Sequence, residues 1–134
     1  MNTTISLAQY WLYLQYVFFS LVMLSAFIAL YLHITPVAEI KEIRAGNTAC
    51  ALSFGGAVLG FCLPLASSIA SSVSLPDFAL WGLAAALVQI LVYLGASRLI
   101  RNASAELAAG NTAVGTLFAA LALSVGLINA ACLT

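Results

Sequence analysis

The side chains best suited to bind or react in this chain are a few amides set among long apolar runs. The candidates for a polar lining or a helix cap are Asn47, Asn111, Gln89, Asn129 and Gln15. An amide both donates and accepts hydrogen bonds. For Gln15, Gln89 and Asn129 two interpretations stay open: a hydrogen bond between packed helices, or the lining of a narrow conduit.

No catalytic or metal-binding motif accompanies these amides. His33 is the only histidine and has no neighbouring ligands, and Cys50, Cys62 and Cys132 lack the spacing of a metal site. Buried thiols usually pack as small hydrophobes. The sequence also contains no phosphate loop, nucleophile elbow or zinc motif. We therefore expect no enzymatic activity, no cofactor and no bound metal.

The composition places these residues in a membrane. Of 134 residues, 64% are hydrophobic and 6% are charged, with a net charge of zero. Charged residues normally make up about 25% of a soluble domain, so a soluble fold is excluded. Disorder would need low hydrophobicity and high charge, and nucleic-acid binding would need a basic patch. The expected environment is a lipid bilayer.

The chain divides into four apolar segments, each close to the roughly 20 residues that a membrane helix needs, at about 9–33, 48–71, 78–98 and 111–132. They fill the sequence, so residues 1–134 are expected to form a single, all-α integral membrane domain. The first segment lacks the basic start of a signal peptide and is expected to be a retained helix. No acid or base falls inside a segment, whereas proton- or cation-coupled carriers generally keep one there.

The basic residues predict the orientation. Lys41 and Arg44 follow the first segment, while Arg98 and Arg101 follow the third. Four crossings place both loops on one side, and the positive-inside rule makes that side the cytoplasm. Both termini are then expected to be periplasmic, in a multi-pass protein of the bacterial inner membrane. Aromatic side chains near the start of the first and third segments fit a belt at the outer interface.

Residues 35–45 are expected to form a short helix at the level of the lipid headgroups. Thr35 is the expected cap and Pro36 the expected first residue. Val37, Ile40 and Ile43 recur at helical spacing and predict the apolar face. The charged residues of the segment are expected elsewhere around this helix. An ordinary polar loop is the alternative.

An internal repeat joins the two halves. Residues 45–49 read Ala-Gly-Asn-Thr-Ala, and residues 109–113 read the same. We therefore predict two parallel two-helix repeats, about 9–71 and 78–132, related by an axis along the membrane normal. Asn47 and Asn111 fall where an N-cap is needed, after a glycine that permits a sharp turn. The alternative role for the two amides is to bind an anion or a lipid headgroup.

A face of small residues runs along the second segment. It comprises Ser53, Gly56, Gly60, Pro64 and Ser67. Small residues let helices approach closely in lipid, which favours packing within the bundle. An oligomer interface or a pore lining is the alternative. A proline in mid-helix should also bend this segment and free one backbone carbonyl.

Five short stretches carry a resemblance to a known family. They are Leu59-Gly60, Pro64-Leu65-Ala66-Ser67-Ser68, Leu75-Pro76-Asp77-Phe78, Trp81-Gly82 and Asn129-Ala130-Ala131-Cys132. From about Ile34 onward the chain resembles the YjfL-type bacterial inner-membrane proteins, catalogued as domain of unknown function 350. The resemblance implies a four-helix inner-membrane protein built from a duplicated unit. It also implies a link to envelope stress, because members are often encoded beside a phage-shock-type membrane-remodelling protein and an ATP-grasp ligase.

These observations predict a homo-oligomeric inner-membrane protein associated with the cell envelope, with a possible conduit between subunits. One alternative is a channel or permease for a small solute or ion. Another is a membrane scaffold that recruits a cytoplasmic stress-response protein through residues 35–45 and 99–108. No nucleic acid is expected as a partner.

Overall fold

The protein is an all-helical bundle in the computed structural model, which describes residues 4–133. The helices of this range are α1 (Leu7–Ile34), α2 (Glu39–Arg44), α3 (Thr48–Ser71), α4 (Leu75–Leu99), α5 (Ala103–Ala108) and α6 (Thr112–Cys132). Between residues 4 and 133 there is no strand. Residues 1–3 and 134, which carry the two termini of the orientation prediction, lie outside the described part.

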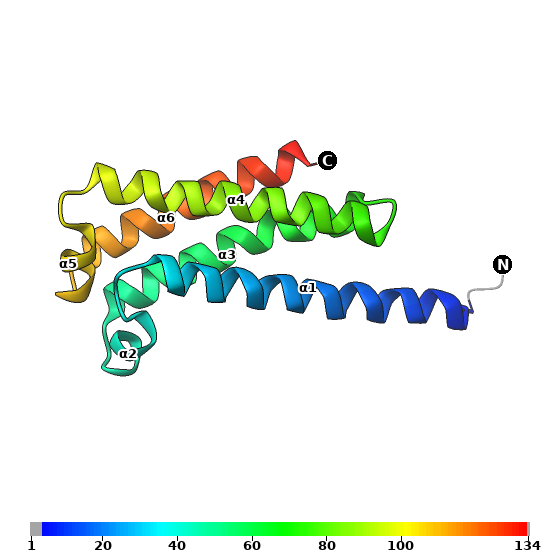
Figure 1. Cartoon of the computed structure of the whole chain (residues 1–134), viewed down its shortest axis with the longest axis horizontal. Coiled ribbons are helices and arrows are strands. Elements are labelled where there is room, and N and C mark those ends of the chain that lie inside the picture. Colours follow the sequence, from blue (N-terminus) through cyan, green and yellow to red (C-terminus); the bar gives the residue numbers. More distant parts are fainter. Residues whose placement is uncertain (1–3, 134) are drawn as a thin grey trace.

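The four long helices are each long and apolar enough to cross a membrane, as expected. They begin and end within about three residues of the expected segments. The two short helices, α2 and α5, lie at one end of the bundle (Figure 1). The start of α1, the turn between α3 and α4, and the end of α6 lie toward the other end, as the four crossings require.

Helices α3 and α6 form the closest pair in the bundle. A side-chain carbon added at Gly56 would collide with the backbone of Ala119, and one added at Gly60 would lie 2.5 Å from the carbonyl oxygen of Ala122. In the other direction, a carbon added at Gly115 would collide with the backbone of Ala49. Glycines on both helices therefore let the two backbones touch, which is how membrane helices gain packing energy.

An aromatic cluster fills the space that α1, α3 and α4 share toward the α2 and α5 end. Phe27 stacks on Phe61, with ring centroids 4.4 Å apart. Tyr31 meets Tyr93 edge to face at 5.3 Å. Aromatic rings bury large apolar areas, and both arrangements are favourable ones. The cluster joins the end of α1 to the rest of the bundle.

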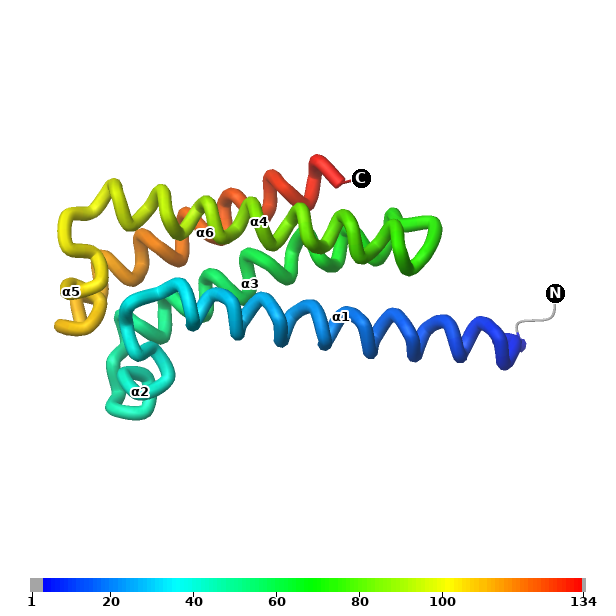
Figure 2. The backbone as a smooth tube through the Cα atoms, viewed as in Figure 1, coloured from blue at the N-terminus to red at the C-terminus, as the bar shows by residue number. Residues whose placement is uncertain are grey.

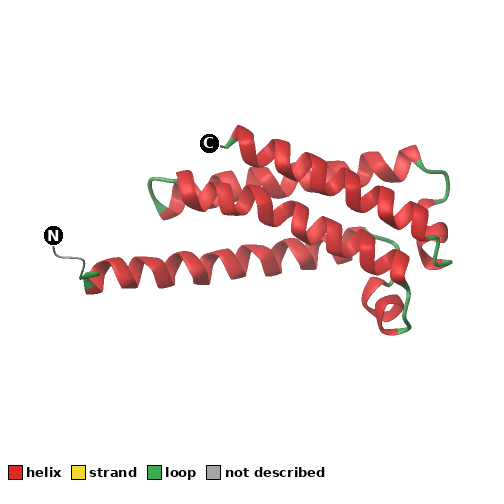
Figure 3. Ribbon diagram, turned by 180° about the vertical axis from the view of Figure 1, so that it is seen from behind, coloured by secondary structure: helices red, strands yellow, loops and turns green. Residues whose placement is uncertain are grey.

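Helix α1 diverges from the bundle toward its own start, as the tube in Figure 2 and the rear view in Figure 3 both show. Of its 28 residues, only Phe27 and Tyr31 are buried, and both lie in its second half. At 1.5 Å per residue α1 is about 42 Å long, more than the hydrocarbon core requires. Its first half therefore presents apolar side chains with little support from the same chain.

The segment after α1 differs from the expectation in two ways. The predicted cap Thr35 instead ends α1, where its Oγ1 donates to the carbonyl oxygen of Tyr31 at 2.8 Å. Helix α2 starts only at Glu39, with no side-chain cap. The predicted apolar face is confirmed at Val37, which is buried, and at Ile43, which packs against the core, but Ile40 is exposed and Glu39 is buried in its place. Helix α5, at the equivalent place in the second half, was not expected.

Candidate functional site

The structure does not gather the five candidate amides into one site. Asn47 and Asn111 stand at the starts of α3 and α6, and Asn129 lies near the end of α6. Gln89 is buried on the inner face of α4, whereas Gln15 is half-buried on the diverging half of α1. The five amides therefore lie in separate surroundings.

Asn47 and Asn111 are helix caps. The Oδ1 of Asn47 accepts from the backbone N–H of Cys50 at 3.2 Å, and the Oδ1 of Asn111 accepts from that of Val114 at 3.4 Å. The preceding glycine has a positive φ in both places, +88° at Gly46 and +84° at Gly110. Only glycine adopts this backbone conformation at little cost, which explains the repeated Gly-Asn pair.

The two amides are not available to an anion, so that alternative does not fit the geometry. The Nδ2 of Asn47 donates to the Glu42 carboxylate at 3.2 Å and that of Asn111 to the Glu106 carboxylate at 2.8 Å. Asn47 also donates to the carbonyl oxygen of Leu107 at 2.9 Å. The amide of Asn47 thus has acceptors for both its hydrogens and that of Asn111 for one. The two carboxylates beside them would repel an anion.

The small-residue face of α3 packs inside the bundle. Ser53, Gly56, Gly60 and Pro64 are buried, and Ser67 is half-buried. Gly56 and Gly60 face α6, and the Oγ of Ser67 donates to the carbonyl oxygen of Ala130 on α6 at 2.7 Å. The face is therefore covered by a helix of the same chain, which leaves no room there for a second copy or a pore.

Pro64 has no N–H to donate to the carbonyl oxygen of Gly60, four residues earlier in α3. This carbonyl lies at the contact between α3 and α6. A side-chain carbon added at Gly126 would collide with the Gly60 carbonyl oxygen. The Nε2 of Gln89 lies beside the same two glycines and donates weakly to the carbonyl oxygen of Ala122, at 3.4 Å. The proline therefore sits at a polar point in the middle of the bundle.

A small cavity lies inside the bundle, beside the aromatic cluster. Its volume is about 10 Å³, and its polar lining comes from Tyr31, Ser53, Gln89 and Tyr93. The Oε1 of Gln89 is buried and has no hydrogen-bond partner within residues 4–133, whereas the buried hydroxyl of Ser53 pairs with that of Tyr31. About 10–15 Å³ is the least that holds one water molecule. The interior thus has polar lining but no open path.

Glu39 is the buried charged group that the sequence analysis did not single out. Its side chain is 2% exposed, and its Oε2 has no partner in the described part of the chain. Burial raises the pKa of this carboxyl to about 8. A carboxylate in low dielectric loses its hydration, which favours the protonated form. The only signal in the sequence was its place in a charged cluster, and a cluster gives no indication of burial.

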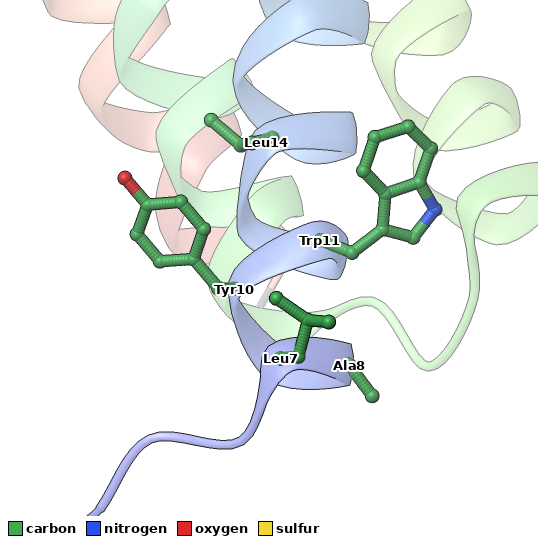
Figure 4. Close-up of a pocket in the computed structure, with 5 residues that line it drawn as sticks. All are labelled: Leu7, Ala8, Tyr10, Trp11 and Leu14. Atoms are coloured by element: carbon green, nitrogen blue, oxygen red, sulfur yellow. The ribbon is translucent and has the colours of Figure 1, made fainter.

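Another hollow, of about 500 Å³, is lined by apolar and aromatic side chains of α1 alone. Figure 4 shows that Tyr10 and Trp11 point to different sides of the helix around it, so the hollow is an open apolar surface. No group of three potential metal ligands occurs among residues 4–133. Asn129, at the far end, has a buried Nδ2 without a partner in this range.

The chain is similar to a family of known proteins over almost its whole length. The family model described as Domain of Unknown Function (DUF350) matches residues 4–133. The UPF0719 inner membrane protein YjfL of Escherichia coli strain K12 is 38% identical over 119 residues, which cover 89% of this chain and 90% of that protein. The protein of the same name from Escherichia coli O157:H7 matches equally. No solved structure matches.

Proposed function

This chain belongs to the family described as Domain of Unknown Function (DUF350), and on that premise we propose that it is a component of the bacterial inner membrane that works as an assembly of copies. In this proposal a conduit for a small solute or ion runs between the copies, and the role in the envelope is not enzymatic. The relatives named above are called inner membrane proteins, which supports the location.

The observation that carries the proposal is Gln15 on the diverging half of α1. Its side chain is half-buried among Trp11, Leu14, Phe18 and Phe19, and no hydrogen bond to it is found within residues 4–133. Lipid offers an amide no hydrogen-bond partner, so an amide left facing lipid is costly. A helix from a second copy, packed against this half of α1, supplies the missing partner.

The interior of one chain supports a conduit between copies rather than through a copy. Its polar cavity holds about 10 Å³, room for a single water molecule at most. The small-residue face of α3 is covered by α6. The remaining surface on which a polar path could form is the side of the bundle that α1 leaves open.

The two halves are proposed to be parallel repeats related by rotation about the membrane normal. Support comes from matching local geometry: each half has a six-residue helix, a glycine with positive φ, and an asparagine cap bonded to a glutamate five residues earlier. The Tyr31–Phe54 and Tyr93–Phe118 ring pairs also match, with centroids 6.0 and 6.1 Å apart. Because each half crosses twice, both halves point the same way.

The test of the assembly is disulfide cross-linking in native membranes. The variant Gln15→Cys, in a background with Cys62→Ala and Cys132→Ala, is expected to form a covalent dimer with a mild oxidant. Leu83→Cys is the control, because Leu83 is an exposed residue on α4 at a similar distance from the start of its helix. If Gln15→Cys stays monomeric, or if both variants cross-link equally, this half of α1 is not an interface.

Flux measurements test the conduit separately. Purified protein in liposomes is expected to release potassium ions or glycerol, used as probes of a small ion and a small neutral solute. Gln15→Leu removes the polar group and is expected to reduce the flux, whereas Leu83→Ala is the matched change away from the interface. Liposomes that hold folded, cross-linkable protein and release neither probe contradict the conduit.

A scaffold for a cytoplasmic stress-response protein is the second candidate. It is favoured by the end of the bundle formed by α2 and α5, where Lys41, Arg44, Arg98 and Arg101 are all exposed. Such an end attracts an acidic partner through the field of its charges. Replacing all four residues by glutamine is expected to abolish co-purification of the partner. A partner that still co-purifies, or none at all with the unaltered protein, contradicts this candidate.

A further inference from the structure

Two buried oxygen atoms lack partners in the described chain, and they belong to Glu39 and Gln89. Their side chains are 2% and 4% exposed. The hydroxyl of Ser53, which is 1% exposed, pairs with that of Tyr31. A buried polar atom without a hydrogen bond has lost its hydration with nothing in exchange, so native proteins rarely keep several. A buried carboxyl and a buried amide of this kind in one small bundle call for an explanation other than stability.

Two tyrosines link Glu39 to the small cavity. Glu39, on α2, interacts electrostatically with Tyr31 of α1 and with Tyr93 of α4. These two tyrosines line the small cavity, and Ser53 and Gln89 line it too. We call this set of five residues the polar column. It starts at the end of the bundle where α2 and α5 lie, and it ends at Gln89, beside the carbonyl of Ala122.

We infer that Glu39 is a proton-binding site at the mouth of the polar column, and that it exchanges its proton with water on the side of the bundle where α2 and α5 lie. The reaction is the simple one: the carboxylic acid releases a proton to water and becomes a carboxylate, and the reverse restores it. The inference concerns a single chain and holds whether or not copies assemble into a conduit.

The groups that face Glu39 explain why the ligand is a proton. Tyr31 comes from α1, Cys50 from α3 and Tyr93 from α4, and Glu42 lies on the same short helix and acts on Cys50. None of these groups is a cation, so none stabilises a carboxylate. Helix α5 contributes the uncharged Ser104 beside Tyr93. A metal ion would need more carboxylates or other ligands, and no such group occurs in residues 4–133.

The charge environment of Glu39 also favours the protonated carboxyl. Burial is the cause that raises the pKa of Glu39 to about 8, with no neighbouring cation to lower it. A buried carboxyl without a partner neutralises by taking up a proton. The carboxyl enters the bundle from α2, outside any span.

Infrared difference spectroscopy of the full-length protein in membranes tests the inference directly. The stretching band of a protonated carboxyl is expected to disappear between about pH 6 and about pH 10, with a midpoint near the pKa of about 8. The band should be absent from Glu39→Gln, which keeps the shape of the neutral acid. It should remain in Glu106→Gln, the control at the equivalent end of the second half.

Two results would overturn the inference: a wild-type spectrum with no carboxyl band that titrates above neutral pH, or a titrating band that persists in Glu39→Gln. Tyr31→Phe serves as a second variant. It keeps the carboxyl but removes a hydroxyl that faces it, so the band should remain while its midpoint shifts. An unshifted midpoint would show that the tyrosine hydroxyl lies outside the site and contradict the polar column.

Discussion

The side chain of Asn47 donates a hydrogen bond of 2.9 Å to the carbonyl oxygen of Leu107, sixty positions later in the sequence. A second bond, of 3.2 Å, reaches the carbonyl oxygen of Ala108. The cap of α3 therefore also holds the last turn of α5, where the carbonyl oxygen of Leu107 accepts from the backbone N–H of Gly110 as well. Asn111, the equivalent residue, donates only to Glu106.

This difference predicts unequal effects of one substitution at the two caps. In Asn47→Asp and in Asn111→Asp the capping oxygen stays, but the donor to the nearby glutamate is lost. Only Asn47→Asp also loses the two bonds to α5. We expect it to cost about 1–2 kcal/mol more than Asn111→Asp. Thermal unfolding of both variants in one detergent measures the difference. Equal losses would mean that the bonds to α5 contribute nothing.

Stability should fall as pH rises, because of Glu39. Burial raises its pKa from 4.5 to about 8, so the folded protein holds a proton that the unfolded chain releases between these values. The stability that this proton contributes is complete below about pH 4.5 and is lost as pH rises through about 8, with a slope of at most about 1.4 kcal/mol per pH unit.

Comparison of two variants isolates this contribution. Glu39→Gln is neutral at every pH, so its unfolding temperature should depend less on pH over this window than that of the wild type. Glu106→Gln alters a half-exposed carboxyl and should keep the wild-type slope. Unfolding is followed in one detergent at several pH values. Parallel curves for Glu39→Gln and the wild type would contradict the prediction.

The proposed orientation makes a separate prediction. With Lys41, Arg44, Arg98 and Arg101 all at one end, the positive-inside rule places that end in the cytoplasm. A reporter that is active only in the periplasm should be active when fused after α6, and inactive when inserted between α4 and α5. Activity at both sites, or at neither, would be a failed insertion; the reverse pattern would overturn the orientation.

The helices and caps were open to prediction from the sequence. Apolar runs of sufficient length leave few alternatives in a membrane, because a backbone in lipid must bond within itself. The Gly-Asn pair predicted both caps, since a positive φ and a side-chain acceptor are local requirements that two residues meet. The same match could have located α5, because α2 stands at the equivalent place in the first half.

The burial of Glu39 depends on packing between helices, and so does the identity of the helix that covers the small-residue face. A linear sequence pattern does not specify such packing. Helix α2 is only six residues long, so its periodicity barely distinguishes one face from another, and its docking on α3 decides which side chain is buried. Likewise, glycines on α3 show that some helix approaches closely. The glycines of α6 are equally good partners in the same chain or in another.

Adjacent glycines on α3 give the sharpest test of the α3–α6 contact. A side-chain carbon at Gly55 meets nothing within 4 Å, whereas one at Gly56 meets the Ala119 backbone. Gly55→Ala should be neutral or slightly stabilising, because alanine is the better helix former by about 1 kcal/mol. Gly56→Ala forces the helices apart and should destabilise by about 1–3 kcal/mol.

Gly55→Ala is the control for Gly56→Ala, because the two variants have the same composition and differ only by one position. Thermal unfolding and yield in detergent measure the outcome. Because the collision lies within one chain, Gly56→Ala should lower the unfolding temperature at every protein concentration. A loss that disappears as concentration rises would instead place this contact between two copies, and equal stability of both variants would show that the helices do not touch here.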